Sequence, residues 1–417
     1  MADSSCPPIE DTYHPEPDVE YLEDYVPGGY HPTLIGDTFC SGRYTVVHKL
    51  GFGGYSTIWL AWDQQLQRYV SLKILTARES PVSHEGKVLQ YLMKSDITHA
   101  RKRFIPPPLD QFSFHGPNGH HDGNFMFPAD TARSTAAQLL LGLSYLHANG
   151  ICHEDLHLRN FLLRIPNLDG QSTTELYERF GKPSEVPIRR VDGKSGEPHA
   201  PPLAIFPMAL SIPANKEHSP EIIISDYGTS FNVSETPTPT LYTPALYSPP
   251  EDFLNEPINQ PTAADIWTLG VNLYEVLGER PLFETFAWDR DDIVGQMINT
   301  LGQPPARWWN SWAKRSKFFE DGSWVTDFRR IHTPVFRRLR QRLWDMGRGE
   351  TEQTCEWDVA GGEPRALEDF LRAMMTFGPA ERPSADQLLG SEYMVKWALP
   401  AWERQKRQKS AHSTEER

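Results

Sequence analysis

The chain has 417 residues, with 41 Lys and Arg against 55 Asp and Glu, which gives a net charge of −14. This length suffices for one large domain or two ordinary ones, and the negative charge makes nucleic acid a poor direct partner while suiting basic ligands. The four cysteines are scattered without a Cys-x-x-Cys pair, which indicates free thiols rather than disulfides or a zinc site. Since no apolar run reaches the roughly 18 residues of a membrane span, we expect a protein of the cytoplasm, the nucleus or both, with no membrane partner.

The first part of the chain is predicted to be rich in strands. Residues 1–30 contain many Pro, Asp, Glu and Tyr without periodicity, so we expect them to be extended or disordered. Alternating apolar residues over 43–50, 56–62 and 69–75 predict three strands, of which the first two form a hairpin. A short helix is expected over 84–93.

Helices are predicted to dominate the rest of the chain. The clearest is expected over 131–148, where Gly150 is placed to end it. Leucines recur there at helical spacing, namely Leu139, Leu140, Leu143 and Leu146. Further helices are predicted over 263–277, 291–301 and 367–375.

A long segment between these regions is predicted to be irregular. Residues 166–220 hold nine prolines and show little periodicity, so we interpret them as an irregular insert. The apolar run over 222–224 then predicts a buried strand. The chain ends in a charged tail, which we expect to be frayed over about 404–417.

A glycine-rich turn joins the first two predicted strands. At Gly51, Gly53 and Gly54 phosphate oxygens could approach the backbone N–H groups without a Cβ in the way. Ser56 completes the spacing Gly-x-Gly-x-x-Ser. The pattern predicts a phosphate-binding turn, although an ordinary glycine-containing hairpin would show the same pattern.

Lys73 ends the third predicted strand among apolar neighbours, where an ammonium group is costly unless it is paired. We predict that it holds the α- and β-phosphates of a nucleotide and that a helix carboxylate orients it. Glu85 is the first candidate for this carboxylate, and Glu79 is the second. The alternative is a lysine whose charged end simply reaches solvent at the end of a strand.

Three polar residues, each placed after an apolar run, complete a candidate phosphoryl-transfer site. Asp155 would accept the hydrogen bond of the attacking hydroxyl and orient it in line with the γ-phosphate. Asn160 and Asp226 would supply oxygen ligands for Mg²⁺. Asp and Asn also cap turns, but capping does not explain why each residue follows an apolar run that ends in a loop. We therefore interpret the three as a catalytic set.

Further residues are predicted to brace this site without touching substrate. Glu251 closes the sequence Ser-Pro-Pro-Glu, and Arg382 is its expected partner in a buried ion pair. Asp265 lies at the start of a predicted helix, where its carboxylate could accept backbone N–H groups from the loop around His153.

With these residues in place, the chain resembles the eukaryotic protein kinases, and more specifically the SR-protein kinases, which phosphorylate Ser/Arg-rich splicing factors. The specific part of the match rests on Asp-Tyr-Val-Pro-Gly-Gly-Tyr-His-Pro (24–32), Lys-Leu-Gly-Phe-Gly-Gly-Tyr-Ser-Thr-Ile-Trp-Leu (49–60) and Ala-Asp-Ile-Trp (264–267). The resemblance covers about 24–165 and 221–396 and is generic toward the C-terminus.

The resemblance implies an α+β, bilobal protein-kinase fold. Its small β-rich N-lobe would span 41–129 and its larger helical C-lobe 130–396, flanked by an N-terminal extension over 1–40 and a charged tail over 397–417. The activity implied is that of an ATP- and Mg²⁺-dependent serine/threonine kinase. Its implied substrates are Ser/Arg-rich splicing factors, and we expect it to act as a monomer.

Three residues depart from the family's pattern. Glu154 replaces the arginine that usually precedes the catalytic Asp, so the chain lacks the usual cationic partner for a phosphorylated activation loop. His157 replaces a lysine and would be a weaker phosphate contact near neutral pH. Tyr227 replaces the usual Phe or Leu beside the metal-binding Asp, which is a tolerable apolar substitution.

The connection between the two expected lobes is short. If residues 124–127 form the last strand of the small lobe, three extended residues, which reach about 10 Å, lead to the helix over 131–148. This leaves no room for the short helix that kinases place here, and Pro128 removes a backbone donor near the adenine. The sequence thus leaves open a pseudokinase, a binding module with impaired ATP binding.

A third interpretation is a small-molecule phosphotransferase. The pattern His-x-Asp-Leu-His-x-x-Asn over 153–160 also resembles the loop of aminoglycoside and choline kinases. The Ser-Pro-Pro-Glu segment and the Asp-Ile-Trp sequence at Asp265 argue against it, because both belong to kinases that act on proteins.

Overall fold

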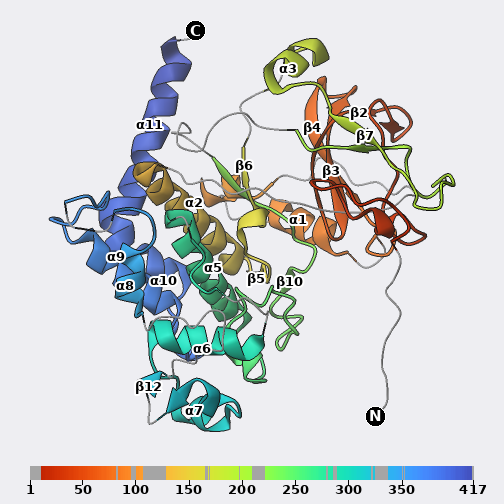
Figure 1. Cartoon of the computed structure of the whole chain (residues 1–417). Coiled ribbons are helices and arrows are strands. Elements are labelled where there is room, and N and C mark those ends of the chain that lie inside the picture. Colours follow the sequence, from red (N-terminus) through yellow and green to blue (C-terminus); the bar gives the residue numbers. More distant parts are fainter. Residues whose placement is uncertain are drawn as a thin grey trace, which may run out of the picture. The chain divides into compact units, whose positions relative to one another are not determined.

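The computed structural model describes residues 11–80, 83–94, 100–106, 128–164, 168, 170–196, 198–208, 221–278, 280–284, 289–320, 323–324, 337–349, 351 and 353–415. Two compact units make up the chain. The first, called the sheet unit, holds the described residues up to Ser83 and those of 168–208. The second, called the helical unit, holds the described residues of 84–164 and all those from Glu221 onward (Figure 1).

A four-stranded antiparallel sheet forms the centre of the sheet unit, in the order β1-β2-β3-β4. Its strands are β1 (Thr38–Phe39), β2 (Tyr44–Gly53), β3 (Ser56–Asp63) and β4 (Arg68–Leu75). The three strands predicted from alternation are confirmed. Alternate residues point to one face, where Val46, Trp59 and Leu72 are buried together.

Of the N-terminal segment expected to be extended or disordered, the described part is ordered, with an irregular backbone apart from the 3₁₀ turn Leu22–Asp24. Apolar and aromatic side chains of this segment are buried with Ala200 and Ala204 of the insert, namely Tyr13, Val19, Leu22, Tyr25 and Tyr30. Glu20 forms a buried ion pair with Lys49 of β2 and accepts a hydrogen bond from the Tyr25 hydroxyl at 2.7 Å. The segment lacks periodicity because single side chains, rather than one face of a regular element, make its contacts.

The insert expected to be irregular over 166–220 contains regular structure. Helix α3 (Thr173–Phe180) starts at a capping box, in which Ser172 and Glu175 satisfy each other's backbone N–H groups. Strands β7 (Glu185–Pro187) and β8 (Leu203–Ile205) form a hairpin. These elements are too short to show a period in the sequence. They are stable because α3 packs against β2 and β3, and the β7–β8 pair packs against the sheet and the N-terminal segment.

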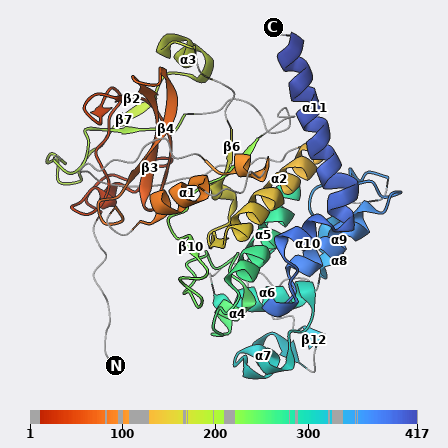
Figure 2. The same cartoon turned by 180° about the vertical axis from the view of Figure 1, so that it is seen from behind.

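The helical unit is built around helices α2 and α5, which pack against each other (Figures 1 and 2). Helix α2 also contacts α10 and α11. The described helices of this unit are α1 (Glu85–Lys94), α2 (Ala129–Ala148), α4 (Pro250–Phe253), α5 (Pro261–Leu277), α6 (Arg290–Leu301), α7 (Ala306–Ser311), α8 (Leu339–Trp344), α9 (Glu363–Met374), α10 (Ala385–Leu389) and α11 (Leu399–Glu415). The predicted helices over 84–93, 131–148, 263–277, 291–301 and 367–375 are confirmed within a few residues.

Short strand pairs in the helical unit frame the loops that carry the candidate site. Strand β5 (Ile151–Cys152) pairs with β10 (Phe231–Asn232), and β6 (Phe161–Leu163) pairs with β9 (Ile222–Ile224). The last pair of this unit is β11 (Phe319–Glu320) with β12 (Ser323–Trp324). Strand β9 lies close to α2, where Gly142 leaves room for the Ile224 side chain: a Cβ at Gly142 would lie 2.7 Å from Ile224 Cδ1.

The C-terminal tail is helical rather than frayed over most of its length. Helix α11 continues to Glu415 and buries Ala401 and Trp402. Ser134 of α2 donates a hydrogen bond to Gln405 at 2.5 Å. No helix in the described ranges is both long and apolar enough to cross a bilayer.

Candidate active site

Asp155 and Asn160 lie close together in the loop between β5 and β6. A single 3₁₀ turn, Leu158–Asn160, brings the Asn160 amide back so that its Nδ2 donates to the Asp155 carbonyl at 2.8 Å and to Asp155 Oδ2 at 3.2 Å. His157 Nε2 lies 3.3 Å from the same carboxylate oxygen. The other oxygen, Oδ1, is buried and has no hydrogen-bond partner among the described residues. Asp155 is therefore oriented by its neighbours, and its partly exposed side chain could accept a hydrogen bond from a substrate hydroxyl.

Asp265 holds the backbone of this loop from helix α5, as predicted. Its two carboxylate oxygens accept the N–H groups of His153 and Glu154, each at 2.8 Å. His147 Nε2 adds a third contact at 3.0 Å. Burial alone would raise the pKa of Asp265, but these hydrogen bonds and the histidines outweigh it and hold the pKa below its usual range.

His153 connects the loop to the segment that carries Asp226. Its Nδ1 accepts the Asp155 N–H at 3.3 Å, and its Nε2 donates to the Ser225 carbonyl at 3.0 Å. This pattern fixes the neutral ring with its proton on Nε2. Burial lowers the pKa of His153 and favours the same neutral form.

Asp226 follows β9 in a left-handed backbone conformation, with φ of 63°. Apart from Gly, mainly Asn and Asp adopt this conformation, so the position suits an aspartate. Gly228 leaves room for the carboxylate, because a Cβ there would lie 3.3 Å from Asp226 Oδ1. Glu85, at the start of α1, accepts the N–H of Tyr227 at 3.2 Å, so this predicted lysine partner contacts the segment next to Asp226.

The remaining predicted site residues belong to the sheet unit. Gly53 is paired with Ser56 at the end of the β2–β3 hairpin, and the Tyr30 hydroxyl donates to the Gly53 carbonyl at 3.3 Å. A Cβ at Gly51 or Gly54 would meet no described atom within 4 Å, which leaves space for phosphate oxygens near this backbone.

Lys73 lies half-buried on β4, paired with Ile58 of β3. The structure therefore brings Asp155 and Asn160 together in the helical unit. In the sheet unit, it places Lys73 on β4, next to β3, the strand that follows the glycine-rich turn. Pairing of Lys73 with Glu85 remains a prediction.

Asn160 and Asp226 suit Mg²⁺ by their chemistry. The Asn160 side-chain nitrogen donates to Asp155, so the side-chain oxygen of Asn160 remains as a possible metal ligand. Within the described ranges, no group of three or more His, Cys, Asp and Glu side chains forms a metal site. A cation here would thus depend on phosphate oxygens as well as on these two residues, which is how proteins commonly bind Mg²⁺ with nucleotides.

The predicted ion pair between Glu251 and Arg382 is present. The guanidinium binds both carboxylate oxygens, at 2.7 and 2.6 Å, and both side chains are buried. Arg382 also donates to the Thr376 carbonyl at 2.8 Å and lies over the Trp267 ring. This network fixes the end of the segment that begins at Asp226.

Two contacts of the catalytic loop, residues 153–160, do not follow from the sequence. His157 is predicted as a phosphate contact, whereas its ring lies beside the Asp155 carboxylate. Glu154 stands where an arginine is usual, and its carboxylate accepts the backbone N–H of Tyr242. Burial raises the pKa of Glu154 to about 7, with hydrogen bonds from Thr229 and Tyr242 opposing the shift. The sequence shows that Glu154 replaces the usual arginine, but it does not show that Tyr242 is the residue that Glu154 contacts.

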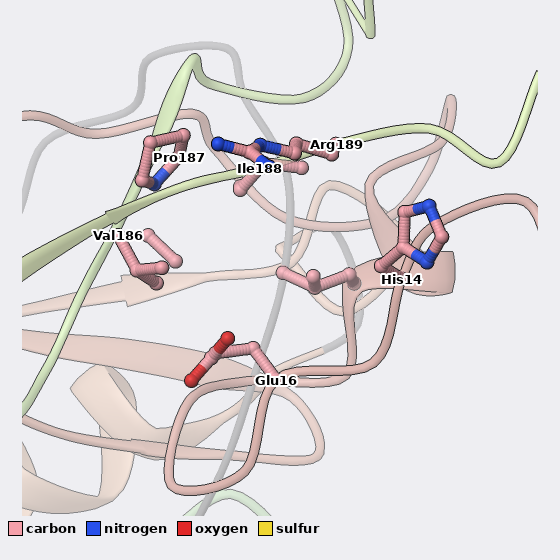
Figure 3. A pocket seen from close by; sticks show the side chains of 8 residues that line it. His14, Glu16, Val186, Pro187, Ile188 and Arg189 are labelled. Carbon is pink, nitrogen blue, oxygen red and sulfur yellow. The ribbon is translucent and has the colours of Figure 1, made fainter. Parts of the chain in front are cut away.

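A cavity of about 410 Å³ lies elsewhere in the sheet unit, between the N-terminal segment and the β7–β8 hairpin (Figure 3). Its lining is largely apolar, with His14, Glu16 and Arg189 as the charged or polar side chains. None of the predicted site residues lines it. The cavity is thus separate from the phosphoryl-transfer residues.

Comparison with known proteins shows the family of the chain. The model of the protein kinase domain matches residues 44–168 and 212–394, and the chain belongs to the protein kinase family. It is 26% identical to protein kinase dsk1 of Schizosaccharomyces pombe, over 92% of this chain and 86% of that protein. Serine/threonine-protein kinase SRPK of Physarum polycephalum is 28% identical over 90% and 91% of the two chains. Human SRSF protein kinase 3 is 37% identical over a shorter stretch, 34% of this chain and 29% of that protein.

These relatives confirm the resemblance to SR-protein kinases, the protein-kinase fold and the assignment as a protein serine/threonine kinase. Kinases of this family use ATP and a divalent metal. The comparisons give no support to the alternative of a pseudokinase. That alternative rested on the short connection before α2, most of which, including the expected strand over 124–127, lies outside the described residues.

Proposed function

We propose that the chain transfers the γ-phosphate of ATP to serine or threonine in proteins rich in Arg and Ser, such as Ser/Arg-rich splicing factors. The observation that carries this proposal is the arrangement around Asp155, where one carboxylate oxygen is held by Asn160 and the other has no partner among the described residues. We further propose that the protein works as a monomer in the cytoplasm, the nucleus or both.

In the proposed reaction, the substrate hydroxyl donates a hydrogen bond to the Asp155 carboxylate, attacks the γ-phosphorus and gives its proton to this carboxylate. The bond between this phosphorus and the ADP oxygen breaks as the new ester bond forms. Lys73 and the backbone near Gly51 and Gly54 would hold the phosphates. Mg²⁺, when bound by Asn160 and Asp226, would neutralise charge on the phosphate oxygens.

Two observations support a substrate rich in Arg. The net charge of −14 suits a basic peptide. Relatives that match this chain include kinases named for SRSF and SRPK. A serine flanked by arginine is also a better partner than one flanked by carboxylates, which the negative surface would repel.

A peptide array tests this specificity. Peptides of Arg-Ser repeats are expected to be phosphorylated at least about tenfold faster than peptides whose serines have acidic flanks, because each unfavourable charge contact weakens binding of the acidic peptide. Asp155→Asn, which keeps the size of the side chain, serves as the matched inactive control. A preference for acidic flanks would refute the substrate assignment and leave the kinase assignment intact.

A further inference from the structure

Glu154 lies at the junction of the catalytic loop and the activation segment, which comprises residues 226–251. Its side chain is buried, with 3% of the residue exposed, and its carboxylate Oε1 accepts the backbone N–H of Tyr242. Its carbonyl accepts the Thr243 hydroxyl at 2.5 Å. One residue therefore contacts two consecutive positions of the activation segment.

The backbone of Glu154 is also held by helix α5. Its backbone has φ of 75°, and its N–H donates to Asp265 on helix α5 at 2.8 Å. The backbone of Glu154 is thus held by helix α5 while its side chain and carbonyl contact the segment. Its second carboxylate oxygen, Oε2, is buried as well, and burying a carboxylate is costly.

The ends of the activation segment are held by other contacts. Near its start, the Ser230 hydroxyl donates to the His153 carbonyl at 3.0 Å and β10 pairs with β5. At its end, Glu251 is bound by Arg382. Residues 242 and 243 lie between these two anchors, where the chain has no helix or strand. Glu154 connects this middle part to the catalytic loop.

We infer that Glu154 is a positioning residue that anchors the middle of the activation segment, and that a phosphate on Thr243 would release this anchor. The inference rests on the proposed kinase function and concerns how the activation segment is held in position at the same site. Where an arginine would attract a phosphorylated segment, Glu154 would not: a phosphate removes the donor that the Thr243 hydroxyl gives to the Glu154 carbonyl. It also places up to about two negative charges next to this residue, where the carbonyl oxygen and the ionised fraction of the side chain repel them. Thr243 is only partly buried and is followed by Pro244, as in substrates of proline-directed kinases.

Hydrogen exchange in the full-length chain tests the anchor without requiring catalysis. Replacing Glu154→Ala should raise the exchange rate of the Tyr242 amide by at least about tenfold, because a hydrogen bond to a charged group is lost. Glu154→Gln should retain most of the protection, since its amide oxygen can still accept the N–H. Equal protection in wild type and Glu154→Ala, with both proteins folded, would overturn the inference.

Peptide kinetics provide the second measurement. Glu154→Ala should raise KM for the peptide with little change in KM for ATP, and Glu154→Gln should restore most of the loss. Thr243→Glu should reduce peptide kcat/KM at least about tenfold more than the nearly isosteric Thr243→Val, because only the former adds a charge. Equal effects of the two Thr243 substitutions would refute inhibition by phosphate. If the wild type phosphorylates no peptide, the proposed function fails. The exchange experiment still shows whether Glu154 anchors the activation segment.

Discussion

Replacing Asp155 with alanine is expected to lower kcat for peptide phosphorylation by about 10²–10⁴-fold, the usual contribution of a residue that orients and accepts the reacting proton. The loss follows from the geometry, since Asn160 and His157 orient the Asp155 carboxylate and its side chain is partly exposed to an incoming hydroxyl. Steady-state kinetics at saturating Mg-ATP measure this change.

The same substitution should have little effect on stability. The Asp155 side chain is 22% exposed, and removing a carboxylate with one unsatisfied oxygen costs little. The melting temperature is therefore expected to shift by no more than a few degrees. A large drop in melting temperature would indicate a structural capping role, and retained transfer activity would remove Asp155 from the reaction.

Replacing Arg382 with alanine is expected to cost about 3–5 kcal/mol in the free energy of unfolding, as when one partner of a buried ion pair is removed. Glu251 would stay buried without its bidentate partner, and the carbonyls of Thr376 and Phe377 would each lose a donor. Urea denaturation monitored by circular dichroism measures the loss, irrespective of whether the protein is active.

Matched variants separate the ion pair from the loss of packing. Arg382→Lys keeps the charge but cannot bind both carboxylate oxygens, so an intermediate loss is expected. The double variant Glu251→Gln with Arg382→Ala should recover part of the stability, because the buried charge is gone. A change below about 1 kcal/mol for Arg382→Ala would mean that this network behaves as an exposed surface pair.

Elements with strong local patterns were predictable from the sequence. Helix α2 has four leucines at helical spacing, and β2, β3 and β4 alternate, so their existence follows from periodicity alone. Asp265 and the pair of Glu251 with Arg382 were predictable as bracing contacts because their motifs define both partners.

Contacts made by single residues could not be predicted in this way. The N-terminal segment and the insert are ordered by scattered tyrosines and by short elements, whose stability comes from packing rather than from pattern. The contact of Glu154 with Tyr242 joins residues 88 positions apart through a backbone N–H, which every residue except proline has. No side-chain pattern can reveal such a partner.

The proposed function requires that Lys73, Asp155, Asn160 and Asp226 all act on one Mg-bound ATP. Thermal unfolding with increasing Mg-ATP tests it most directly, because a ligand that binds only the folded protein raises the melting temperature. We expect wild type to show this rise, Lys73→Met to show a weaker one, and Asp226→Asn to lose the part that depends on Mg²⁺. The absence of any rise in wild type at millimolar Mg-ATP, or unchanged binding in both variants, would contradict the account.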